Sequence, residues 1–72
     1  MIRVSKLNKE EFYINPSLIE TIEKTPDTVI TLTTNKKYVV AESAEELLGV
    51  IVEYYRIINT VPPQITYSPK GY

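Results

Sequence analysis

The chain has 72 residues and a formal net charge of −1, from eight basic and nine acidic side chains, and this balance argues against a nucleic-acid-binding face. It contains neither cysteine nor histidine, which excludes disulfides and thiolate metal sites and removes the commonest metal ligand and general base. A chain this short buries only about 60% of its unfolded surface, so it needs idealised packing or oligomerisation for stability.

Two extended runs around a polar turn open the chain. Residues 2–7 show the period of two of a half-buried strand, and residues 11–15 contain the aromatic and β-branched run Phe12-Tyr13-Ile14, which predicts the two strands of a hairpin. Asn8 is assigned to the turn, because asparagine tolerates a positive φ. Asn15-Pro16 then redirects the chain, since proline keeps the preceding residue out of the helical region, and a short turn is predicted at residues 16–18.

Three further strands are predicted before the helix. Residues 19–24 fit either one helical turn or a strand, and their β-branched side chains favour the strand. Thr25-Pro26-Asp27-Thr28 has proline at the second position of a type I turn. Residues 28–34 are the best strand candidate, and residues 37–41 return beside it to complete a second hairpin.

A capping box marks the start of a helix predicted over residues 44–58. The Ser43 hydroxyl can accept a hydrogen bond from the Glu46 backbone N–H, while the Glu46 side chain returns to the Ser43 N–H. Acidic residues in the first turn also suit the positive end of the helix dipole. The helix is therefore the most strongly signalled element of the chain.

This helix carries an apolar arc that is wider than one small sheet requires. The arc is centred on Leu47, Ile51, Tyr54 and Ile58, and it is widened by Val50 and Ile57 on one side and by Leu48 and Tyr55 on the other. One interpretation is a poorly amphipathic helix with tyrosine hydroxyls at its rim. The other is that one side packs on the sheet while a second subunit covers the predicted self-association residues, Leu48, Val52 and Tyr55.

Residues 59–72 form a tail of a different kind. Pro62-Pro63 ends any helix and favours an extended conformation, after which residues 64–67 are a candidate edge strand. The predicted fold is α+β: a small antiparallel sheet built from two β-hairpins, then one C-terminal amphipathic helix, together forming a domain over residues 1–58 that is followed by the extended, proline-containing tail.

No constellation of residues predicts catalysis. The sequence has no Ser-His-Asp set, no Cys-His pair, no metal-ligand cluster and no glycine-rich phosphate loop. Its paired carboxylates fit a helix cap and a solvated helix face better than acid/base chemistry, namely Glu45, Glu46 and Glu53. We therefore expect a protein that is not an enzyme, with no catalytic residue, no cofactor and no metal.

Six tyrosines are the compositional oddity of the chain. Tyrosine combines an apolar body with a polar tip, which suits protein interfaces. Tyr13 lies beside the Asn-Pro corner, so we predict a partner surface formed by Tyr13, Asn15 and Pro16.

The run Glu11-Phe12-Tyr13-Ile14-Asn15-Pro16 and the residues around it, 7–23, are similar to the opening of the FlbD family of small flagellar proteins, also called SwrD. Residues 25–33 and 38–40 and the predicted helix continue the resemblance, which extends from residue 2 to about residue 58. The family usually carries Asn-Gly at both hairpin turns, where this chain has Asn8-Lys9 and Thr34-Asn35. Because Asn-Gly favours type I′ turns, we expect both hairpins to form with a different turn type.

The resemblance implies a cytoplasmic, non-enzymatic accessory protein of bacterial flagellar motility that supports motor power in swarming. Expected partners are further copies of the chain and stator or basal-body proteins at the cytoplasmic face of the flagellar base, with no membrane span of its own. Two alternatives stay open. One is a purely structural element of a flagellar complex, and the other is a nucleic-acid or second-messenger-binding regulator, in which exposed tyrosines share one surface with Lys6, Lys9, Lys36 and Lys37.

Overall fold

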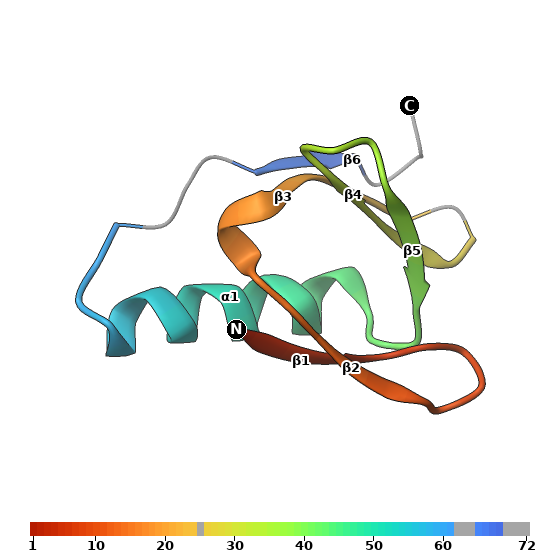
Figure 1. The fold of residues 1–72 in the computed structure, drawn as a ribbon, viewed down its shortest axis with the longest axis horizontal. Helices are drawn as coiled ribbons and strands as arrows, with labels where there is room; N and C mark the ends of the chain where they lie inside the picture. The colour runs from red at the N-terminus through yellow and green to blue at the C-terminus, as the bar shows by residue number, and fades with distance from the viewer. Residues whose placement is uncertain (25, 62–64, 69–72) are drawn as a thin grey trace.

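The computed structural model describes residues 1–24, 26–61 and 65–68. Within these ranges, the elements follow one another in the order β1 (Ile2–Ser5), β2 (Glu11–Ile14), η1 (Pro16–Leu18, a 3-10 helix), β3 (Ile19–Lys24), β4 (Thr28–Leu32), β5 (Lys37–Val40), α1 (Ala44–Ile57) and β6 (Thr66–Ser68) (Figure 1). The predicted α+β class is confirmed. None of the helices in the described ranges has the length and apolar character needed to cross a membrane.

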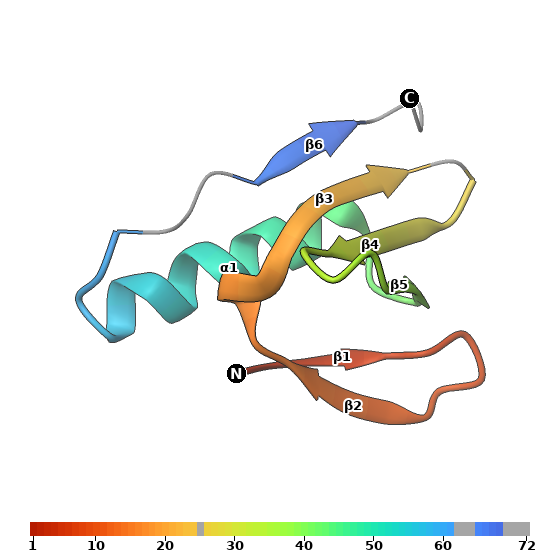
Figure 2. The same ribbon diagram turned by 45° about the horizontal axis from the view of Figure 1, so that its top comes forward.

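The strands form two sheets. β1 and β2 make an antiparallel hairpin, and the larger sheet has the strand order β5-β4-β3-β6, in which only β6 runs parallel to its neighbour β3. One antiparallel bridge joins Lys6, the residue after β1, to Val40 at the end of β5. The two predicted hairpins therefore belong to separate sheets, and β6 and the β1–β2 hairpin lie at opposite edges of the molecule (Figures 1 and 2).

The first hairpin turns on Lys9 rather than on Asn8. Lys9 has a φ of 72°, and its N–H donates to the Lys6 carbonyl at 2.9 Å, while the Lys6 N–H donates to the Glu10 carbonyl at 2.8 Å. This pattern is a type I turn followed by one left-handed residue. Asn8 contributes through its side chain, which accepts from the Glu10 N–H at 3.0 Å. Asn8 lies in the turn as predicted, and the residue with the positive φ is Lys9.

The second hairpin repeats this geometry. Asn35 has a φ of 70° and donates its N–H to the Leu32 carbonyl at 2.9 Å, and the Leu32 N–H donates to the Lys36 carbonyl at 2.8 Å. In each Asn-Gly-equivalent pair, only the second residue has a positive φ, whereas a type I′ turn requires a positive φ at both. The expected change of turn type is confirmed.

The Asn-Pro corner is an element of the fold. The Asn15 carboxamide oxygen accepts from the Ser17 N–H at 3.1 Å and from the Ser17 hydroxyl at 2.8 Å, which caps η1 at the position of the predicted turn. Pro16 is fully buried. The Leu18 carbonyl then accepts from the Thr33 N–H at 2.8 Å, so the corner is also tied to the end of β4.

The capping box predicted for the helix is confirmed. The Glu46 N–H donates to the Ser43 hydroxyl at 3.0 Å, and the Ser43 N–H donates to the Glu46 carboxylate at 3.2 Å. The helix ends at Ile57, and Asn59, with a φ of 56°, follows in the left-handed region. This conformation lets the Thr60 N–H reach back to the Tyr55 carbonyl at 3.0 Å, which satisfies one of the last helix carbonyls.

The core lies between α1 and the two sheets. Among the described residues, it consists of twelve buried apolar side chains, those of Ile2, Val4, Ile14, Ile19, Ile22, Ile30, Leu32, Val40, Ala44, Leu47, Ile51 and Tyr55. Ile22 and Ile30 are paired across β3 and β4 and are fully buried. Burial of a side chain of this size contributes about 1.5–3 kcal/mol relative to exposure.

The tail adds β6 to the free edge of β3. Ile65 and Tyr67 pack against the core, and the Tyr67 hydroxyl contacts the Glu45 carboxylate at 3.5 Å. Glu45 also pairs with Lys24 of β3 at 3.3 Å. Three predicted features lie outside the described residues: the extended conformation at Pro62-Pro63, the first residue of the candidate edge strand, Gln64, and the first residue of the predicted turn, Thr25.

Candidate functional site

The apolar arc of α1 is covered mainly by the chain itself. Ala44, Leu47, Ile51 and Tyr55 are buried, and Leu48 is half-buried against the core. Two flanks remain exposed. Val52 forms one, with 57% of its side chain exposed, and Val50 and Ile57 form the other, with exposures of 44% and 70%.

The structure corrects the predicted self-association surface of Leu48, Val52 and Tyr55. Tyr55 is only 5% exposed, because it lies on the same helix face as Ile51 and therefore points into the core. Burial raises the pKa of the Tyr55 hydroxyl, and the neighbouring Tyr54, whose ring lies edge-on at 5.3 Å, raises this pKa further. Tyr55 is thus a core residue, Leu48 is shared between core and surface, and Val52 alone offers exposed apolar surface.

The predicted partner surface at the Asn-Pro corner is also corrected. Pro16 is buried and has no surface to offer, and the side chain of Asn15 is occupied by Ser17. Tyr13 is the exception, because 64% of its side chain is exposed on β2. Of the three predicted residues, Tyr13 is therefore the one with a largely exposed and unoccupied side chain, and it lines the groove described next.

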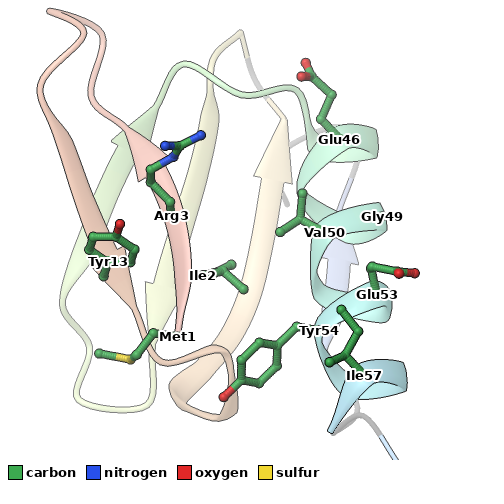
Figure 3. A pocket seen from close by; sticks show the side chains of 10 residues that line it. All are labelled: Met1, Ile2, Arg3, Tyr13, Glu46, Gly49, Val50, Glu53, Tyr54 and Ile57. Atoms are coloured by element: carbon green, nitrogen blue, oxygen red, sulfur yellow. The ribbon is translucent and has the colours of Figure 1, made fainter.

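A mainly apolar groove of about 630 Å³ runs between α1 and the β1–β2 hairpin (Figure 3). Val50 and Tyr54 point from the helix toward the hairpin, and Ile2 points from β1 toward the helix. Met1 and Tyr13 line the hairpin side, and Ile57 extends the helix side, so the groove gathers apolar side chains from both ends of the sequence. Its volume lies within the range of ordinary binding pockets, although it is an open groove.

The helix side of the groove has no side chain at its middle, where residue 49 is glycine. A Cβ atom placed on Gly49 would meet nothing within 4 Å, so no packing within the described chain requires glycine at this position. A side chain here would reduce the space along the groove wall. Gly49 therefore leaves this part of the groove wall open.

The charged groups around the groove have structural roles, except for the second carboxylate oxygen of Glu46. Glu53 is paired with Arg56, and the hydrogen bond from Arg56 lowers the pKa of the Glu53 carboxyl. The Nε atom of Arg3 lies 3.7 Å from a carboxylate oxygen of Glu11. Glu46 holds the helix cap through one carboxylate oxygen, and within the described ranges it has no ion-pair partner.

Two of the four lysines named in the nucleic-acid alternative, Lys6 and Lys36, lie over neighbouring aromatic rings. Lys6 is paired with Glu10 at 3.3 Å and lies 5.8 Å from the centre of the Phe12 ring. Lys36 lies 5.7 Å from the centre of the Tyr38 ring, and the two half-buried rings are 5.1 Å apart. The two ammonium groups thus lie over aromatic rings that a stacking nucleic-acid base would need.

The family model for flagellar and swarming motility proteins, FlbD, matches residues 1–59. The chain belongs to the FlbD family. The match includes β1, β2 and all of α1, which are the elements that form the groove of this FlbD protein, and it ends before β6. Searches of the curated proteins and of the solved structures return no significant match.

Sequence reasoning had found one residue of the FlbD groove, Tyr13, and had missed the others. The signal was present in the helix pattern, because Val50 and Ile57 widen the apolar arc on the side opposite Leu48. What the pattern could not indicate is which flank the tail strand and the sheet would cover. Met1 carried no signal, since its position beside α1 depends on how the hairpin joins β5.

Proposed function

We propose that this FlbD protein is a non-enzymatic, cytoplasmic accessory factor of flagellar motility that acts by binding a partner protein in the groove between α1 and the β1–β2 hairpin. The observation that carries the proposal is the exposed apolar groove itself, built from Val50, Tyr54 and Ile57 on one side and Met1 and Tyr13 on the other. Contiguous apolar surface of this kind marks interaction sites in small soluble proteins.

The energetics favour a protein partner. Complete burial of a valine or isoleucine side chain contributes about 1.5–3 kcal/mol, and both Val50 and Ile57 still have much of their surface to bury. Tyr13 adds a large exposed ring, and its hydroxyl can form hydrogen bonds with polar groups at the rim of an interface. A partner that covers the groove therefore gains affinity from a few side chains, as hot-spot interfaces do.

The proposal assigns no chemical reaction, cofactor or metal to the groove. Its ionisable groups already have structural tasks, since Glu46 caps the helix and Glu53 holds Arg56. We propose stator or basal-body proteins at the cytoplasmic face of the flagellum as partners, with support of motor power in swarming as the outcome. Self-association is proposed through Val52, on the opposite flank of the helix.

Site-specific photo-crosslinking in cells tests this proposal. A photoreactive amino acid at position 57 lies in the groove, and one at position 39 of β5 is the control, because Val39 is exposed but does not line the groove. We expect position 57 to crosslink to a stator or basal-body protein and position 39 not to do so. Equal crosslinking to that protein from both positions, or from position 39 alone, would contradict the proposal.

A further inference from the structure

We infer that the groove binds its partner as an extended peptide segment, which adds as a strand to the free edge of β1 and directs a basic side chain toward Glu46. This inference rests on the proposed function and specifies the conformation and chemistry of the partner at the same site.

The backbone of Ser5 shows which way the edge of β1 points. The Ser5 N–H donates to the Glu42 carboxylate at 2.9 Å, and the Ser5 carbonyl accepts from the Ala41 N–H at 2.7 Å. Both backbone groups of Ser5 are therefore directed away from β2. In an antiparallel pair, the backbone groups of successive residues alternate between the partner strand and the opposite edge. Arg3, two residues earlier, thus presents its N–H and carbonyl on the same outer edge as Ser5.

At Arg3 this edge is open. Across the described residues, neither the N–H nor the carbonyl of Arg3 has a hydrogen-bond partner on that side. Ile2 and Arg3 line the groove, with Val50 on the facing helix wall (Figure 3). Farther along β1, the bonds of Ser5 to Ala41 and Glu42 close the edge, so only the N-terminal half of β1 can accept a strand.

The open edge distinguishes an extended occupant from a helical one. A helix or a flat protein surface laid over the groove would bury the N–H and carbonyl of Arg3 without partners, and such burial carries the full desolvation cost of both groups. An added strand can bond to both groups.

Side-chain alternation along the added strand defines the rest of the ligand. Every second side chain faces the groove, where Val50 and Tyr54 offer apolar contact. Glu46, at the other end of the helix wall, has a carboxylate without an ion-pair partner in the described part of the chain, whereas the charge of Glu53 is balanced by Arg56. The preferred segment is therefore extended, with an apolar residue for Val50 and a lysine or arginine for Glu46.

Selection from a displayed library of random linear peptides on the 72-residue chain supplies the probe. Peptides that bind the wild type are compared on Val50→Glu, Arg3→Ala and Arg3→Pro, with Arg3→Ala as the matched control because it keeps the backbone N–H. We expect Arg3→Pro and Val50→Glu to weaken binding by about tenfold or more, equivalent to about 1.4 kcal/mol, and Arg3→Ala to have a smaller effect. Selected peptides are expected to combine alternating apolar residues with a basic one.

A second measurement leaves the protein unchanged. N-methylation of the peptide amides that face β1 is expected to abolish binding, and methylation of the alternate amides is expected to be tolerated, because only one edge of an added strand bonds to β1. Peptides that bind as helices, that tolerate both methylation patterns, or that bind Val50→Glu as well as the wild type would overturn the inference, as would a library that yields no binder. The groove proposal would still stand after such a result if position 57 crosslinks to a flagellar protein, so the two failures are distinguishable.

Discussion

The N–H of Ala41 donates to the carbonyl of Ser5 at 2.7 Å, which fixes the β1–β2 hairpin against the chain that leads from β5 into α1. Glu42 adds a second bond to the same residue, from the Ser5 N–H to its carboxylate at 2.9 Å. These two bonds hold one end of the hairpin beside the start of the helix. Beyond them β1 and α1 face each other across the groove, so the groove is a consequence of where the pairing stops.

Replacement of Lys9 by glycine is expected to stabilise the fold. Lys9 has a φ of 72°, and a left-handed conformation costs a non-glycine residue about 1–2 kcal/mol, whereas the added freedom of glycine in the unfolded chain costs about 0.4–1 kcal/mol. We expect the free energy of unfolding to rise by up to about 1 kcal/mol, measured from the urea midpoint. Asn8→Gly is the control and is expected to destabilise, because it removes the acceptor for the Glu10 N–H. The opposite order of the two variants would contradict the assigned turn.

Truncation of Tyr55 is expected to destabilise the fold strongly, whereas truncation of Tyr13 is expected to leave its stability almost unchanged. Tyr55→Ala removes a buried ring and should lower the free energy of unfolding by about 3–5 kcal/mol, as for other large aromatic core residues. Tyr13→Ala, on exposed surface, should change it by less than about 0.5 kcal/mol while weakening binding in the groove. Denaturant unfolding of both variants checks this assignment. A Tyr55→Ala variant as stable as the wild type would contradict the assignment of Tyr55 to the core.

Acidification is expected to remove a contribution of Glu45 to stability. The pKa of its carboxyl is lowered from the ordinary 4.5, first by a hydrogen bond from its own backbone N–H and then by the hydrogen bond and charge of Lys24. A lowered folded-state pKa contributes stability that is present above the unfolded pKa and is lost as the pH falls through the folded pKa. The stability difference between wild type and Glu45→Gln should therefore shrink between about pH 5 and about pH 3. A difference that stays constant over this range would contradict the assignment.

Self-association through Val52 is tested by sedimentation velocity. Val52 is exposed on the helix flank away from the groove, so Val52→Glu should leave the circular dichroism spectrum intact while reducing the oligomer fraction. Glutamate is chosen because an uncompensated charge is costly to bury at an interface. A wild-type chain that sediments as a monomer at micromolar concentration would remove self-association from the account.

Local chemistry is what made parts of this fold predictable. The capping box was visible because Ser43 and Glu46 lie three residues apart and bond only to each other's backbone. The hairpins were visible from alternation around polar turns, yet the choice of Lys9 over Asn8 for the positive φ was not. That choice depends on the hydrogen bonds of the whole turn, which single-residue preferences do not contain.

The remaining features depend on contacts between distant parts of the chain. Ser5 and Glu42 are 37 residues apart, and no local pattern indicates that the Glu42 carboxylate accepts from the Ser5 N–H at the edge of β1. The parallel pairing of β6 with β3 likewise brings Thr66 beside Thr21. Once β6 and the larger sheet are placed, Leu48 is half-buried while Val52 on the same flank stays exposed, and Val50 and Ile57 stay exposed on the other flank. The candidate site could not be assigned to the correct flank without this information.

The most direct test of the central claim is the motility of cells that carry Val50→Glu or Val52→Glu in place of the wild-type chain. The two variants share the helix, the substitution and partial exposure, and they differ in which flank they alter. With equal protein levels, we expect Val50→Glu to lose swarming and Val52→Glu to retain more of it. Normal swarming with Val50→Glu would contradict the assignment of the groove as the functional surface.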